Sequence, residues 1–178
     1  MSNELTETLT GGLEPQQLRR ELQETQTKNL NRRRAIIGLS LVGMGAMTMV
    51  SLFQTGVIKH LPDPPIDGFD SDKVNSSDTA YALGVPDGTL SLASLAANIP
   101  LAGFGGADRA SEQPLIPLFS AGKAIVEAGI AGWYFYQMAA VEKKWCGYCI
   151  TGALANFGIA VLTLPEAVEA LETLNGNE

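Results

Sequence analysis

Two long runs without a charged residue set the strongest limit on how this chain can fold. Residues 35–58 are 24 consecutive uncharged positions, and residues 146–164 form a second such run. About 20 apolar residues are enough for a helix to cross the hydrocarbon core of a bilayer. Only 17% of the whole chain is charged, which is a low fraction for a soluble protein of this size. The sequence therefore predicts membrane-spanning helices in both runs.

Two further apolar stretches lie between these runs. Residues 89–104 form a short one and residues 114–140 a longer one, and the polar residues 105–113 separate them. Residues 59–88 are rich in Pro, Asp and Ser, and their proline cluster does not fit a helix interior. We therefore expect an all-α fold: a polytopic membrane four-helix bundle with an extracytoplasmic loop, residues 59–88, between its first and second spans.

The charges predict how the chain is oriented and divided. Three consecutive arginines, 32–34, precede the first span, and clusters of basic residues stay on the cytoplasmic side of a membrane. We therefore expect a cytoplasmic polar arm over residues 1–34, a transmembrane domain over 35–165 and an acidic cytoplasmic tail over 166–178. In this arrangement the fourth span ends at Pro165 and both termini are cytoplasmic. The net charge of −7 and the absence of a basic patch argue against a nucleic-acid partner.

Two features of the third span allow more than one interpretation. Lys123 and Glu127 are four residues apart and therefore share one face of a helix. They neutralise each other inside the bundle or, alternatively, handle protons, and a transporter function would depend on this pair alone. The aromatic residues 133–136 are typical of a belt at the membrane interface, with a wall against a bound molecule as the alternative.

The only two cysteines, Cys146 and Cys149, lie at the start of the fourth span. Two thiols three positions apart can close a small disulfide, and a helix N-terminus next to Lys143 and Lys144 favours the thiolate of the first. We expect Cys146 to be the more exposed thiol and Cys149 to lie one turn deeper among apolar neighbours. Zinc normally needs four ligands, so no metal site is expected. Two buried, inert thiols are the alternative interpretation.

The residues around the cysteines resemble a known family. The segment 145–151, Trp-Cys-Gly-Tyr-Cys-Ile-Thr, is followed by Asn156, and the loop segment 71–77, Ser-Asp-Lys-Val-Asn-Ser-Ser, is followed by Gly-Val-Pro at 84–86. Both segments are similar to motifs of the vitamin K epoxide reductase family. The resemblance covers roughly residues 40–165 and agrees in order, spacing and number of spans.

The resemblance implies a four-helix bundle that encloses a quinone, with the cysteine pair at its outer mouth. Cys149 would meet the quinone, and Cys146 would accept electrons from a thiol partner, either thioredoxin-like or another extracytoplasmic thiol protein. Asp87, Tyr148 and Asn156 fall at positions that would contact the quinone. The implied location is a bacterial cell membrane or a thylakoid membrane.

The chain also departs from the family pattern. Asp63 and Ser71 stand where the family has two loop cysteines, and Ala153 stands where some members have a tyrosine. The internal relay of electrons through the loop is therefore absent, and the loop is expected to be a structural lid. Two functions remain: a membrane thiol–quinone oxidoreductase that oxidises its thiol partner directly, or a membrane assembly or accessory protein that does not turn over.

Overall fold

The computed structural model describes residues 14–176, and over this range the fold is all-α. The described part contains no β-strand, only one isolated bridge between Phe69 and Trp145. The first 13 residues of the predicted polar arm and the last two of the predicted tail lie outside the described residues. The elements in chain order are α2 (Pro15–Glu24), α3 (Lys28–Gln54), α4 (Ser71–Asn75), the 3₁₀ helix η1 (Asp78–Tyr81), α5 (Asp87–Gly103), α6 (Arg109–Glu112), α7 (Leu115–Tyr136), the π-helix η2 (Gln137–Glu142) and α8 (Gly147–Asn175).

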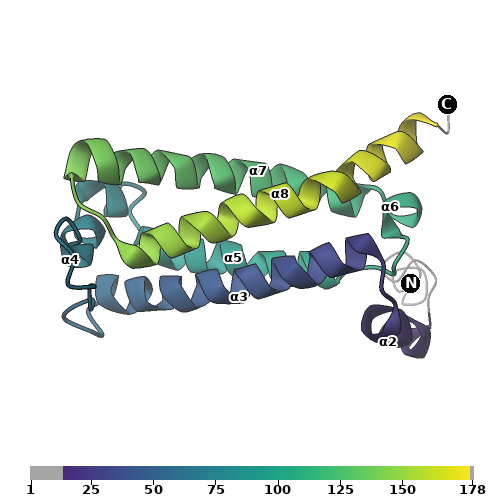
Figure 1. Ribbon diagram of the computed structural model, residues 1–178, viewed down its shortest axis with the longest axis horizontal. Helices are drawn as coiled ribbons and strands as arrows, with labels where there is room; N and C mark the ends of the chain where they lie inside the picture. Colours follow the sequence, from purple (N-terminus) through teal and green to yellow (C-terminus); the bar gives the residue numbers. More distant parts are fainter. Residues whose placement is uncertain (1–13, 177–178) are drawn as a thin grey trace.

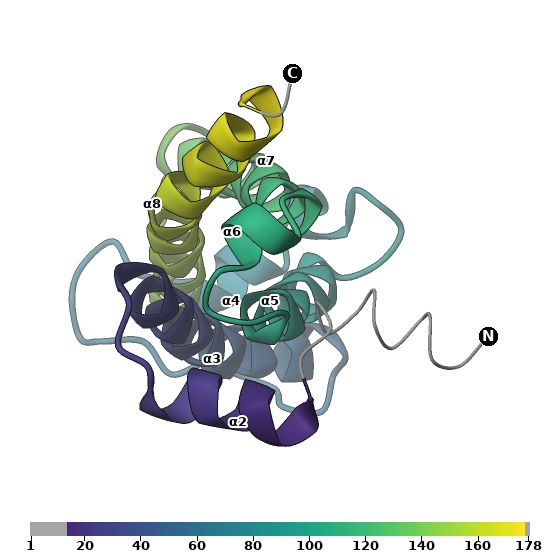
Figure 2. The ribbon, with the colours of Figure 1, turned by 90° about the vertical axis from the view of Figure 1, so that its right-hand side faces the viewer.

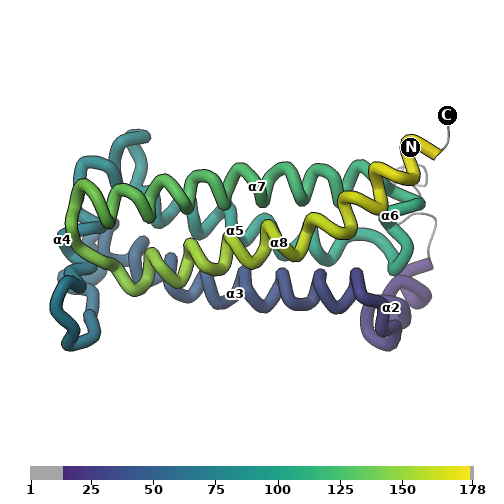
Figure 3. Tube along the Cα trace, turned by 45° about the horizontal axis from the view of Figure 1, so that its top comes forward, coloured from purple at the N-terminus to yellow at the C-terminus, as the bar shows by residue number. Residues whose placement is uncertain are grey.

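Four long helices lie alongside one another (Figure 1). Helix α3 packs against α5 and α8, and α7 packs against α8 and α5. The view along the helices in Figure 2 shows these four elements around a common centre. The loop that carries α4 winds across one end of the assembly, and α2 and α6 lie at the opposite end (Figure 3).

Three of these helices are long and apolar enough to cross a membrane: α3, α7 together with η2, and α8. Their surfaces carry large apolar side chains that the fold leaves exposed, such as Val42, Phe119 and Val161 at 59–66%. A soluble protein rarely exposes apolar surface so widely, whereas a bilayer covers it. These properties indicate a membrane protein. Helix α5, at 17 residues, is not among the three, so a fourth crossing stays a prediction.

Small residues let α3 approach its neighbours closely. A Cβ atom on Gly43 would lie 3.0 Å from Leu95 of α5 and 3.1 Å from Ala155 of α8. A Cβ atom on Gly152 of α8 would lie 2.9 Å from Met47 of α3. Without a hydrophobic driving force in lipid, such close backbone approach is how membrane helices gain packing energy.

The last span is predicted to end at Pro165, but helix α8 itself continues through this proline to Asn175. A proline inside a helix removes one hydrogen bond and costs about 3 kcal/mol. Contacts just beyond it offset that cost. Buried Glu166 accepts a bidentate pair of hydrogen bonds from Arg109, at 2.9 and 2.7 Å, and Ala170 is fully buried. Tertiary contacts thus extend the helix past a local breaker.

Helix α3 likewise begins before the predicted first span, so the arginine triplet lies inside this helix. Arg33 is 2% exposed and donates hydrogen bonds to the carbonyl oxygens at the end of α5 and just after it, at 2.7–3.0 Å, namely those of Ala102, Phe104, Gly105 and Gly106. The last carbonyls of a helix have no partner within it. Arg33 therefore caps α5 and joins it to α3. At the other end of the described chain, Pro15 is the first residue of α2, a position that suits proline.

Candidate active site

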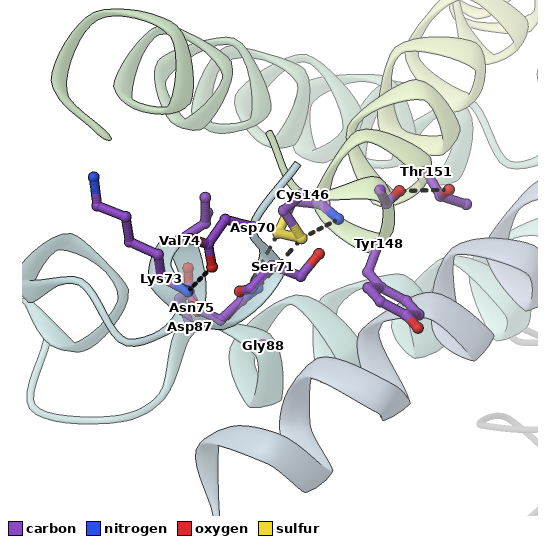
Figure 4. The surroundings of a disulfide bond; sticks show 12 residues. Asp70, Ser71, Lys73, Val74, Asn75, Asp87, Gly88, Cys146, Tyr148 and Thr151 are labelled. Atoms are coloured by element: carbon purple, nitrogen blue, oxygen red, sulfur yellow. Dashed lines mark hydrogen bonds between the residues drawn. A yellow bond between two sulfur atoms is a disulfide. The ribbon is translucent and has the colours of Figure 1, made fainter. Parts of the chain in front are cut away.

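The two cysteines are joined by a disulfide at the start of α8, with their Cα atoms 5.3 Å apart (Figure 4). Lys143 ends η2 with a left-handed backbone (φ 52°), and the chain then turns into an extended segment that leads to Cys146. Cys146 is the N-cap of α8, and its sulfur accepts a hydrogen bond from the backbone N–H of Cys149 at 3.1 Å. The pair thus occupies the N-terminus of a helix, as the sequence predicts.

The loop between α3 and α5 is fastened directly beside the disulfide. Trp145 donates its N–H to the carbonyl of Gly68 at 2.9 Å, and Asp70 donates its N–H to the carbonyl of Trp145 at 3.0 Å. Asp70 then caps α4 by accepting from the N–H of Lys73. These bonds hold α4 next to Trp145, the residue that precedes Cys146.

The expectation that Cys146 is the more exposed thiol is wrong. Its side chain is fully buried, and Val74 of α4 and Met138 of η2 pack in the same cluster. Cys149 is half-buried and lines a partly open cavity. The position of Cys146 at a helix start suggests an exposed side chain. It is buried because a loop folds over it, and Asn75 of that loop lies 71 residues away in the chain.

Asp63 and Ser71, the two loop residues that the resemblance sets against cysteines, contact each other. The Ser71 hydroxyl donates to one carboxylate oxygen of Asp63 at 2.6 Å, and the Ser71 N–H donates to the other at 2.7 Å. Ser71 is fully buried, so the pair closes the loop by hydrogen bonds where a disulfide is impossible. Nearby, the His60 ring contacts the Asp72 carboxylate, and this hydrogen bond raises the pKa of His60.

An apolar cavity of about 370 Å³ lies beneath the disulfide. Polar groups converge at two levels of its wall. Asp87, Tyr134 and Cys149 line it, and so do three residues that lie seven positions away from them on the same helices: Ser94, Glu127 and Asn156. Seven residues make about two helical turns, a rise of about 10 Å along the helix axis. The first three residues therefore form an outer level near the disulfide, and the other three form an inner level.

The two predicted quinone contacts Asp87 and Asn156 do lie on this cavity. Asp87 accepts a hydrogen bond from Gln54 at 2.6 Å, and Tyr134 lines the same cavity. The side-chain oxygen of Asn156 is buried and has no hydrogen-bond partner among residues 14–176. A buried polar atom without a partner is rare in folded proteins. Such an unpartnered atom is expected where a polar group of a ligand binds.

Tyr148 lies elsewhere. Its hydroxyl donates to the carbonyl of Pro62 at 2.9 Å, and the residue is not part of the cavity wall. The structure therefore does not place Tyr148 on the cavity wall with Cys149, Asp87 and Asn156.

Helix geometry divides the aromatic residues of the third span between two environments. Trp133 and Tyr136 are exposed at 56% and 58%, as a membrane belt would be, whereas Tyr134 faces the cavity.

Lys123 and Glu127 form an ion pair on one face of α7, as expected from their spacing. The Lys123 ammonium also donates to the carbonyl of Ser94 at 2.8 Å and to the side-chain oxygen of Asn98 at 2.9 Å. Asn98 in turn donates to Glu127 at 3.2 Å. The charges are thus compensated by α5, and Glu127 reaches the inner level of the cavity.

Among the residues that sequence reasoning missed is Asn75 of α4, whose amide lies against both sulfur atoms. The only sequence signal was its position inside the loop motif 71–77. No group of three or more metal-ligating side chains occurs among residues 14–176.

The fold and the site together define a helical membrane protein with a cysteine pair beside an apolar cavity. The family model described as the Vitamin K epoxide reductase family matches residues 34–164, and the chain belongs to this family. The match covers both cysteines, the loop and all four long helices over most of their length. A search of curated proteins found no match to the chain.

Proposed function

We propose that this protein is a membrane thiol–quinone oxidoreductase whose Cys146–Cys149 pair carries electrons from a thiol protein to a quinone. Family membership supports oxidoreductase activity. The observation that carries the proposal is the position of Cys149, which is bonded to Cys146 and at the same time lines the apolar cavity. One sulfur of the pair thus faces a space suited to an apolar oxidant.

The cavity suits a quinone ring. Ligand pockets are mostly apolar and have volumes of about 300–1,000 Å³, with a few polar groups that orient the ligand. Quinone carbonyl oxygens accept hydrogen bonds. The amide of Asn156 and the hydroxyl of Tyr134 are donors on the wall of this cavity. Apolar side chains from four helices supply the remaining surface: Val50, Leu90, Leu95, Ile130 and Ala153.

The reaction consists of two exchanges. A dithiol partner reduces the disulfide: its thiolate attacks one sulfur, forms a mixed disulfide, and its second thiol resolves that bond, leaving Cys146 and Cys149 reduced. The reduced pair then transfers two electrons to the quinone, which takes up two protons and leaves as the quinol while the disulfide re-forms. Because the loop covers Cys146, a protein partner reaches the pair only when the loop opens.

The orientation follows from the charges. Arg32 and Arg34 lie at the end of α3 near α2 and α6, and the disulfide lies at the opposite end (Figure 1). With four crossings and the arginines inside, both termini are cytoplasmic, and the pair faces the periplasm of a bacterial cell or the lumen of a thylakoid. Disulfides persist in such compartments.

The direct test is reduction of a soluble quinone analogue by the purified protein in detergent, driven by dithiothreitol. We expect turnover by the wild type and none by Cys146→Ala or Cys149→Ala, because two-electron transfer needs both thiols. Thr48→Ala is a matched control, because its hydroxyl bonds only within α3, to the carbonyl of Met44. An inactive wild type whose pair remains reduced in excess oxidised quinone would contradict the proposal.

That contradicting result would favour the second candidate function, a membrane assembly or accessory protein derived from the family. The observation that favours this candidate is the hydrogen-bonded Asp63–Ser71 pair, which occupies the place of the loop cysteines and cannot exchange electrons.

The loop pair should matter for structure rather than for electron transfer. Asp63→Ala and Ser71→Ala each remove hydrogen bonds of about 1 kcal/mol, so we expect quinone reduction to fall by less than about fivefold. The same dithiothreitol assay measures this. A loss as complete as that of Cys149→Ala would mean that these residues take part in the chemistry.

A further inference from the structure

Asn75 is a residue of α4 that touches both sulfur atoms of the disulfide (Figure 4). Its amide nitrogen lies 3.2 Å from the sulfur of Cys146, and its amide oxygen lies 3.5 Å from the sulfur of Cys149. The side chain is 2% exposed, so water does not compete for these contacts. One amide thus presents a donor to the first sulfur and an acceptor to the second.

The orientation of this amide is determined by its surroundings. The Asn75 nitrogen also donates to the carbonyl of Ser71 at 2.7 Å, which can only accept. The nitrogen must therefore face Ser71 and Cys146, and the oxygen must face Cys149. Gln54 holds the backbone of Asn75 by donating to its carbonyl at 3.3 Å, and the same amide group of Gln54 donates to Asp87 at the cavity wall.

The two contacts have opposite effects on the reduced pair. The sulfur of Cys146 accepts from Asn75 and from the backbone N–H of Cys149, and two donors stabilise a thiolate. The sulfur of Cys149 meets only the amide oxygen of Asn75, which stabilises a thiol that donates its proton and repels a thiolate. Helix position alone would favour the thiolate on Cys146, but it would not hold the proton on Cys149.

We propose that Asn75 is a catalytic residue that divides the charge of the reduced pair, holding Cys146 as the thiolate and Cys149 as the protonated thiol. This inference rests on the proposed function and adds a role for the loop. The proton of Cys149 then lies at the cavity wall, where the quinone is reduced. When the disulfide re-forms, the two sulfurs release two electrons and this one proton, and the second proton of the quinol comes from water.

The test measures the thiolate of Cys146 without any quinone. In the Cys149→Ala background, the rate of alkylation by iodoacetamide is followed against pH in detergent. Asn75→Asp keeps the shape and the acceptor but replaces the donor by a negative charge. Asn75→Leu removes both polar groups. We expect the midpoint of the pH profile to rise by at least about one unit in both variants, which is tenfold less thiolate at neutral pH.

A second measurement uses the intact pair in glutathione redox buffers. Loss of the Asn75 donor destabilises the reduced form, so we expect the equilibrium constant for oxidation of the pair to rise about tenfold, or about 30 mV toward more reducing potentials. Ser77→Ala is the matched control, because the Ser77 hydroxyl bonds to the carbonyl of Val74 in the same loop and no bond joins it to either sulfur. It should leave both readouts unchanged.

The outcomes separate the two proposals. Unchanged pH profile and potential in Asn75→Asp, with the protein eluting as the wild type does in detergent, would overturn the role of Asn75 even if quinone reduction is observed. A shifted pH profile and potential together with an inactive wild type would support the role of Asn75 in the pair and contradict the quinone as its oxidant. If Asn75→Leu does not fold, Asn75→Asp alone decides, and a shift equal to that of Ser77→Ala would also overturn the inference.

Discussion

Cys149→Ala is expected to accumulate a covalent complex between Cys146 and the thiol partner, whereas Cys146→Ala is expected to accumulate none. In Cys149→Ala, the Cys146 thiolate attacks the oxidised partner, one sulfur–sulfur bond forms, and a partner thiolate leaves. The Cys149 thiol, which would attack this bond to close the Cys146–Cys149 disulfide and release the partner reduced, is absent, so the mixed disulfide accumulates. The sulfur of Cys146 is suited to this attack because Asn75 and the backbone N–H of residue 149 both donate to it.

The measurement is a non-reducing gel of membranes from cells that express each variant, with reduction of the same samples as the control. The double variant Cys146→Ala/Cys149→Ala sets the background. Burial of Cys146 under the loop makes this test demanding, because the partner reaches it only by displacing α4. A complex on Cys146→Ala and none on Cys149→Ala would reverse the assignment and make half-buried Cys149 the exchange residue.

The class of fold and the region of the site were predictable from short-range features of the sequence. Uncharged runs of membrane length identify α3 and α8, and the spacing of Cys146 and Cys149 at a helix start identifies the redox pair. The family match then confirms the resemblance over residues 34–164. Each of these features depends on residues close together in the chain.

What could not be predicted depends on contacts between distant residues. Burial of Cys146 and the amide contact from Asn75 exist because the loop pairs with Trp145, and no local pattern contains that pairing. The continuation of α8 past Pro165 depends on Arg109, 57 residues away from Glu166. A hydrophobic pattern specifies which face of a helix is apolar, but not which polar group from another element will cover its end.

The ion pair inside α7 yields the second large effect, which concerns stability. Glu127→Gln or Lys123→Met leaves one charge without its ionic partner, with only the polar groups of Ser94 and Asn98 beside it. Removing one member of a buried pair costs about 3–5 kcal/mol, whereas replacing both by apolar residues of similar volume is often neutral. We therefore expect either single variant to unfold at a markedly lower temperature in detergent, and Lys123→Met/Glu127→Leu to recover most of the loss.

The double variant also decides between the two interpretations of this pair, because Glu127 reaches the inner level of the cavity. If the charges only neutralise each other, as we expect, the double variant reduces quinone at a rate close to that of the wild type. The matched control is Arg109→Met/Glu166→Leu, which removes a buried pair joining α6 to α8 outside the cavity wall. A stable Lys123→Met/Glu127→Leu protein that loses quinone reduction, beside an active control, would show instead that the pair handles protons for the bound quinone.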